Sequence, residues 1–214
     1  MDPRKPPLNT RTATSMELLV LTESFEKGER QDAARALYEG RIAAGRGTPE
    51  RQSVRLMCYL AGRLAPGEKH SRIYVPVAIL QSGQAWCDQA SKVFMFLAWH
   101  LIGADGREIA MKHANGGDGH TVVELEFGGA WHLFDAHRDH QAIYRSDSDD
   151  HILSHAELLV NPYPVKEDGH PWPVGRDDAD KSGFYAPGSL ATLNPRTSEM
   201  IAFNVPWHCP WNCK

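Results

Sequence analysis

Apolar residues recur at helical spacing through the first half of the chain. From Ala90 to Leu101 they fall at i, i+3, i+4, i+7, i+8 and i+11, which predicts an amphipathic helix. Gly83 stands in the approach to this helix and Gly103 follows its last apolar residue, as is typical of helix starts and ends. The pattern places Cys87 at the beginning of the helix.

Three further helices are predicted before this one. Thr14-Ser15-Met16-Glu17 resembles a capping box, and residues 31–44 form a weaker helix that ends near Gly45. Thr48-Pro49 places a cap residue before a proline at the first helical position. The apolar face of that third helix comprises Val54, Met57, Cys58, Ala61 and Leu64, and Pro66-Gly67 ends it.

Strand-like patterns replace the helical ones after residue 102. Residues 107–112, 121–127 and 131–134 are rich in β-branched, aromatic and alternating apolar residues, and residues 72–77 form a short extended approach to the Cys87 region. We therefore expect an α/β (α+β) fold, with the cysteine-bearing helix packed on an antiparallel sheet of about four or five strands and preceded by N-terminal helices.

The Gly128-Gly129 pair predicts a two-residue hairpin turn between two of these strands. If Phe127 and Ala130 flank the turn, Leu125 pairs with His132 and Val122 pairs with Asp135. Asp135 then lies diagonally opposite His120 on one face of the sheet, close enough for their side chains to meet. A one-residue slip in register would separate them.

Residues from about 146 onward are expected to be loop-rich, because prolines and glycines interrupt them repeatedly. Their aromatic residues indicate packing rather than disorder. We interpret 1–214 as a single domain in which 1–47 is an N-terminal helical region, 48–145 the core, and 146–214 a C-terminal wrap that shapes the substrate cleft.

Composition narrows the class of protein. The formal charge is −4 and 42% of the residues are hydrophobic, so nucleic acid is not a favoured partner. No apolar run is long enough to span a membrane, and Met1–Pro7 lacks the apolar segment of a signal peptide. The four cysteines do not form a secreted disulfide framework, which favours a reducing cytoplasm.

A cysteine at a helix start, a histidine on a strand and an aspartate on the next strand suit nucleophilic catalysis. Only a thiolate attacks well, and both a helix N-terminus and a neighbouring imidazole favour that form. This order predicts Cys87 as nucleophile, His120 as general base and acid, and Asp135 as the residue that orients the imidazole. The alternative for Cys87 alone is a small buried hydrophobic residue.

Residues 50–140 resemble the transglutaminase-like superfamily, relatives of papain-type thiol enzymes. The resemblance is carried by SVRLMCYLAGRL, GQAWCDQASKVFMFLAWHLIG and GHTVVELEFGGAWHLFDAH. In that family a cysteine at a helix start faces a histidine and an aspartate on adjacent antiparallel strands. The resemblance therefore implies the same roles for Cys87, His120 and Asp135.

Acyl transfer also needs donors aimed at the developing oxyanion, and the backbone N–H of Cys87 is one natural supplier. Gln81, six residues before the cysteine as in papain-like enzymes, is the side-chain candidate, and Trp86 is a further oxyanion or substrate-contacting candidate. The glutamines could equally bind only loop backbone.

The sequence supports a metal site less strongly than it supports a thiol nucleophile. His137 and His140 have a spacing that suits a metal but have no matching second pair of ligands, and the motif containing His208, Cys209 and Cys213 is more typical of an ordinary chain end. We expect no metal and no cofactor. The remaining histidines are interpreted as surface or core residues.

The predicted function is cysteine-dependent acyl transfer through an acyl-enzyme, giving an amide hydrolase, a deamidase or an amide-forming acyltransferase. The substrate would be a peptide, a protein or a small amide or thioester; the oligomeric state stays open. A non-catalytic module that binds a peptide or glycan is the alternative. A metal-dependent hydrolase built on His137 and His140 is a third.

Overall fold

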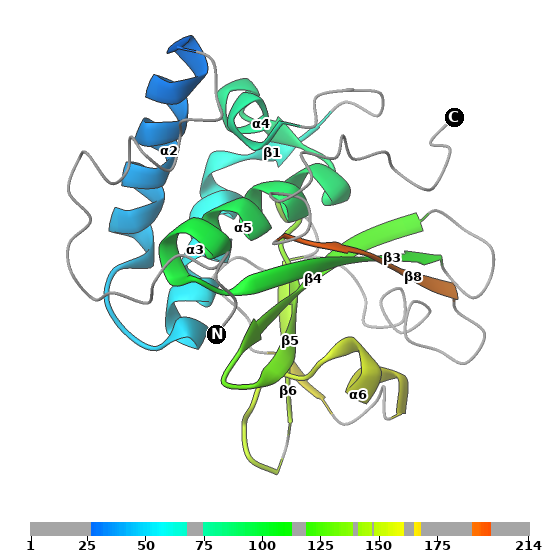
Figure 1. The fold of residues 1–214 in the computed structure, drawn as a ribbon. Coiled ribbons are helices and arrows are strands. Elements are labelled where there is room, and N and C mark those ends of the chain that lie inside the picture. The colour runs from blue at the N-terminus through cyan, green and yellow to red at the C-terminus, as the bar shows by residue number, and fades with distance from the viewer. Residues whose placement is uncertain are drawn as a thin grey trace.

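The computed structural model describes residues 27–67, 75–112, 119–138, 141–146, 148–160, 165–167 and 190–197. The first predicted helix, at Thr14–Glu17, lies outside these residues, as do His140, Cys209 and Cys213. Within the described part of the chain, no helix has both the length and the apolar character needed to cross a membrane. The architecture is mixed α and β: the helices between residues 27 and 102 cover one face of a sheet, and the short helix His155–Val160 packs on the other face (Figure 1).

Helices α2 (Lys27–Ala44) and α3 (Pro49–Arg63) confirm two of the predicted helices. Helix α2 is followed by Gly45, whose φ of 61° is readily adopted by glycine. The hydroxyl of Thr48 caps α3 by accepting a hydrogen bond from the backbone N–H of Arg51. Proline at the first helical position fits because its missing N–H has no intrahelical partner there.

The buried face of α3 includes the predicted Met57, Ala61 and Leu64 but differs from the prediction at its edges. Leu56 and Leu60 are buried, whereas Val54 and Cys58 are only half-buried. Cys58 was predicted to be a core residue, but its side chain is only partly buried. The apolar stripe of α3 is wide enough to fit either face, and packing against α5 and α2 selects the one centred on Leu56 and Leu60.

The chain just before Cys87 is helical where an extended segment was predicted: Pro76 and Val77 belong to a helix, while residues 72–74 lie outside the described ranges. Helix α4 (Pro76–Ser82) begins immediately after Val75 and ends at Gly83, which has a φ of 68°. The proline again stands in the first turn, where its fixed φ favours a helix. The following two-residue strand β2 (Gln84–Ala85) pairs in parallel with β1 (Ala65–Pro66) and leads into the cysteine.

Helix α5 (Cys87–Ile102) is the predicted cysteine-bearing helix, and it is buried along nearly its whole length. It begins at Cys87 and ends at Gly103, whose φ is 74°. The side chain of Gln89 accepts a hydrogen bond from the backbone N–H of Trp86 at 3.0 Å, which fixes the loop entering the helix.

A six-stranded antiparallel sheet with strand order β7-β6-β5-β4-β3-β8 forms the other layer. Its strands are β3 (Asp105–Lys112), β4 (Gly119–Phe127), β5 (Ala130–Asp135), β6 (Ala142–Ser146), β7 (Val165–Glu167) and β8 (Leu190–Arg196). The short helix α6 (His155–Val160) lies between β6 and β7 in the chain. The sheet has six strands where about four or five were predicted, and β6, β7 and β8 were not predicted. Prolines and glycines around β7 and β8 obscure their strand pattern.

The hairpin joining β4 and β5 has the predicted turn and register. Gly128 and Gly129 have φ values of 63° and 83°, the positive angles that a two-residue hairpin turn of this class requires. Phe127 pairs with Ala130 and Leu125 pairs with His132, as the sequence predicts.

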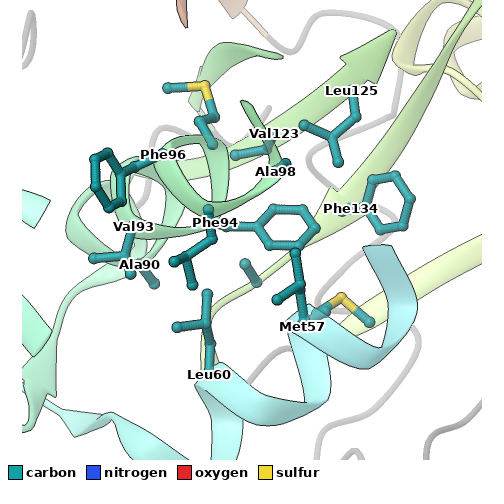
Figure 2. Packing of buried hydrophobic residues seen from close by; sticks show 14 of the residues in the cluster. Met57, Leu60, Ala90, Val93, Phe94, Phe96, Ala98, Val123, Leu125 and Phe134 are labelled. Carbon is teal, nitrogen blue, oxygen red and sulfur yellow. The ribbon is translucent and has the colours of Figure 1, made fainter. Parts of the chain in front are cut away.

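The main core lies between α5, α3 and the sheet. Phe94 of α5 meets Phe134 of β5 at 5.4 Å between ring centroids, and Met57 and Leu60 of α3 close the cluster (Figure 2). At Gly106 of β3 an added Cβ would approach the Met95 side chain to 2.9 Å, so the helix rests almost directly on the backbone of the sheet.

Phe94→Ala should destabilise the protein by about 3–5 kcal/mol, because it removes a fully buried ring from the centre of this core. Urea unfolding measures the change. Tyr38→Ala is the control: Tyr38 is 60% exposed on α2, so its loss should cost about 0.5 kcal/mol or less. Equal costs for the two variants would mean that α5 does not form the centre of the core.

Candidate active site

Cys87 is the first residue of α5 and is half-buried. The first backbone N–H groups of a helix lack intrahelical acceptors and give its N-terminus partial positive charge. A sulfur at this position therefore lies where negative charge is favoured. Strand β2 and the bond from Trp86 to Gln89 determine how the chain enters the helix.

His120 near the start of β4 makes polar contacts on two sides. Its Nε2 lies 2.6 Å from Oδ2 of Asp135, the last residue of β5, and its side chain also hydrogen-bonds Cys87. Since Nε2 is occupied by the carboxylate, Nδ1 is the ring nitrogen left for the thiol. The structure thus brings together the three residues that the sequence singles out.

The two strands place this pair through their register. Val123 is paired with Phe134, so the next position along the hairpin sets Val122 opposite Asp135 and leaves His120 diagonal to the carboxylate. The hydroxyl of Ser91, one turn into α5, donates to the carbonyl of Thr121 at 3.4 Å. This bond joins the beginning of the helix to the residue next to His120.

Burial and the carboxylate act in opposite directions on the imidazole. Burial lowers the pKa of His120, but the charge of Asp135 and the hydrogen bonds from Asp135 and Cys87 outweigh it and raise the pKa to about 10. The charged imidazolium is therefore favoured near neutral pH, and this is the form that can pair with a thiolate.

His137 joins the site in a role that sequence reasoning missed. Its backbone N–H donates to Oδ1 of Asp135 at 3.2 Å, so both carboxylate oxygens are engaged. Its ring stacks on Trp86 with centroids 6.4 Å apart and meets the ring of His120 edge-on at 6.5 Å. The signal in the sequence is its position two residues beyond Asp135, whereas its spacing from His140 directs attention to a metal instead.

Trp86 and Gln81, the two oxyanion candidates, have different surroundings. The indole Nε1 of Trp86 is buried and has no hydrogen-bond partner among the described residues. The side-chain amide of Gln81, at the end of α4, instead donates to the carboxylate of Asp32 on α2 at 2.5 Å. Gln81 therefore ties two helices together at the surface, and the structure does not direct it toward Cys87.

The described residues contain no group of three or more His, Cys, Asp or Glu side chains that could hold a metal ion. His137 contacts aromatic rings, while His140, His208, Cys209 and Cys213 lie outside the described ranges. Burial lowers the pKa of His100 to about 4, so this ring is neutral within the core.

No protein-family model and no curated protein matches the chain. Among solved structures, it is similar to one described as "Crystal structure of a TGase", with a TM-score of 0.39 and 12% sequence identity. The match covers 60% of this chain and 34% of that one, so this chain spans about a third of the length of the structure it matches.

The His120–Asp135 pair should make stability depend on pH. A histidine whose pKa rises on folding stabilises fully below its ordinary pKa of about 6.5, and that contribution is lost as the pH rises through about 10. In Cys87→Ser protein, where no thiol exchanges protons with the ring, the free energy of unfolding should fall by on the order of 1 kcal/mol per pH unit between about pH 7 and pH 9. Urea unfolding across this range measures it.

The control is Cys87→Ser/His120→Gln, which keeps every other titrating group. Its stability should decline less steeply over the same range, and the difference between the two slopes isolates His120. Parallel slopes would mean that His120 retains its ordinary pKa.

Proposed function

We propose that the chain is a cysteine-dependent acyl-transfer enzyme with a transglutaminase-like site. Cys87 is the nucleophile, His120 the general acid and base, and Asp135 the residue that orients the imidazole. The observation that carries the proposal is a single imidazole that hydrogen-bonds both a carboxylate and the thiol at the start of a helix. The substrate is an amide or thioester of a peptide, a protein or a small molecule.

In the first step the sulfur of Cys87 attacks the acyl carbonyl carbon and forms a C–S bond. The proton held at Nδ1 of His120 passes to the leaving amine or thiol as its bond to the carbonyl carbon breaks. Asp135 binds Nε2, which fixes the tautomer and the ring orientation that this transfer requires. The product is a thioester between the acyl group and Cys87.

In the second step His120 takes a proton from the incoming nucleophile, which attacks the thioester and releases the thiol. Water as nucleophile gives hydrolysis or deamidation, and an amine gives a new amide. The half-buried position of Cys87 leaves the sulfur within reach of a substrate.

The backbone N–H of Cys87 and the indole N–H of Trp86 are the proposed oxyanion donors. A buried donor without a partner costs about 1–3 kcal/mol, and Trp86 carries such a donor immediately before the nucleophile. Donating a hydrogen bond to the negatively charged oxygen of a substrate would satisfy it. The engagement of Gln81 with Asp32 argues against the same role for that glutamine.

Acetylation by p-nitrophenyl acetate tests the triad without knowledge of the natural substrate. We expect a burst of p-nitrophenol and a single acetyl group mapped to Cys87 by mass spectrometry. Cys87→Ala should abolish the burst. Asp135→Ala should slow acetylation by about 10-fold to 10³-fold, less than His120→Gln, because a thiolate depends less on the orienting residue than a serine does.

Melting temperatures measured on the same samples separate chemistry from folding. If Asp135 only ends its strand and caps the turn, Asp135→Ala lowers the melting temperature and leaves the rate of the folded fraction unchanged. Acetylation of folded wild-type protein at Cys58 in preference to Cys87 would remove the proposed nucleophile.

Trp86→Phe should slow acetylation by about 10²-fold, because phenylalanine keeps the ring and removes only the N–H. Gln81→Ala is the matched control, since its amide binds Asp32 and should leave the rate within about 2-fold of wild type. A large loss in Gln81→Ala and none in Trp86→Phe would reverse the two assignments.

A further inference from the structure

An ion pair that the proposed reaction does not use joins α5, close to its first turn, to the sheet. The ammonium Nζ of Lys92 is 3.4 Å from Oε1 of Glu108 on β3, and the two side chains are 2% and 0% exposed. The same Nζ reaches back along the helix to the carbonyl of Asp88 at 3.3 Å. The positive charge is thereby fixed next to the residue that follows Cys87.

Stability does not account for this pair. Removing two charges from water costs several kcal/mol, and a well-packed apolar pair of similar volume commonly serves stability as well or better. The pair is also incompletely satisfied, because Oε2 of Glu108 is buried with no partner among the described residues. This unfavourable burial lies one turn from the candidate nucleophile. It therefore indicates a role for the ion pair other than stability.

The position of the pair indicates that role. Lys92 links the start of α5 to β3, while Ser91 links it to the carbonyl of Thr121 on β4, next to His120. The ammonium also adds a full positive charge to the positive end of the helix dipole. Both effects act on Cys87 from the face of α5 that packs against the sheet.

We propose that Lys92 is a positioning residue for Cys87: its ammonium, held by Glu108, fixes the first turn of α5 against the sheet and favours the thiolate. The inference rests on the proposed function. Among the described residues, the titratable groups around this turn include Asp88 on α5, Glu108 on β3, His120 on β4 and, bound to His120, Asp135 on β5.

The raised pKa of Glu108 makes it possible to replace Lys92 without leaving an unpaired charge in the core. Burial raises the pKa of Glu108 to about 7, although Lys92 opposes the rise. If Lys92 is replaced, Glu108 can therefore take up a proton near neutral pH, so no buried charge is left unpaired. Lys92→Met/Glu108→Met goes further and replaces the pair with apolar side chains.

The experiment measures the rate at which iodoacetamide alkylates Cys87 as a function of pH, with each cysteine followed by mass spectrometry. Burial raises the pKa of the Cys58 thiol to about 11, so this cysteine should react slowly and serves as an internal reference. Lys92→Met and the double variant should both react about 10-fold more slowly than wild type near neutral pH. Their rates should converge with wild type at alkaline pH, where the thiolate forms without help.

Glu108→Gln is the matched comparison, because it keeps the ammonium and an oxygen that accepts its hydrogen bond, and it should alkylate within about 3-fold of wild type. Arg35→Met removes a cation from a surface pair with Glu39 and should leave the rate unchanged.

Wild-type rates in the folded double variant at every pH would overturn the inference alone. A slow rate at every pH, without convergence, would indicate a displaced helix and would overturn the electrostatic part. If wild-type Cys87 reacts no faster than it does in His120→Gln protein, the proposed function fails and the inference fails with it.

Discussion

The burial of α5 determines where the rest of the molecule can lie. A helix enclosed between α3 and the sheet has no freedom to slide, because Phe94 fills the core against Phe134 while Gly106 lets the helix rest on the backbone of β3. Each large buried side chain contributes about 1.5–3 kcal/mol to this placement. The N-terminus of α5 is consequently held near the start of β4, where His120 lies.

Two polar groups close to that N-terminus are buried at a cost. The indole N–H of Trp86 and one carboxylate oxygen of Glu108 are buried without partners among the described residues, each at a cost of about 1–3 kcal/mol. Local costs of this kind concentrate where a protein binds or transforms a ligand, and the packing elsewhere offsets them. These two buried atoms support the proposed function, because stability does not explain them.

Much of this arrangement can be predicted from the sequence because it depends on local rules. The glycine pair 128–129 determines the hairpin register, and that register alone places Asp135 beside His120. The helical stripe from Ala90 locates Cys87 in the same way. The stacking of His137 on Trp86 could not be predicted, since it depends on how the chain turns after β5 and how the α5 loop meets it.

Other failures have the same origin in long-range packing. Sequence spacing alone predicts that the amide of Gln81 lies near the cysteine. In the structure this amide instead donates to the carboxylate of Asp32 on α2, which is distant in the sequence. The buried ion pair of Lys92 and Glu108 joins a helix to a strand across the interface between the two layers. The residue pattern of neither segment predicts it. Strand β8 is similar, because only its pairing with β3 gives it a regular structure.

The position of β8 also bears on the order in which the protein is made. Arg107 of β3 pairs with Arg196 of β8, so one edge of β3 has no partner from β8 until the ribosome has translated nearly the whole described chain. During that interval the hairpin and α5 can already assemble, but β3 presents an open row of backbone groups to any other extended chain. The edge of β3 is therefore open to mispairing from the time β3 is made until β8 joins it.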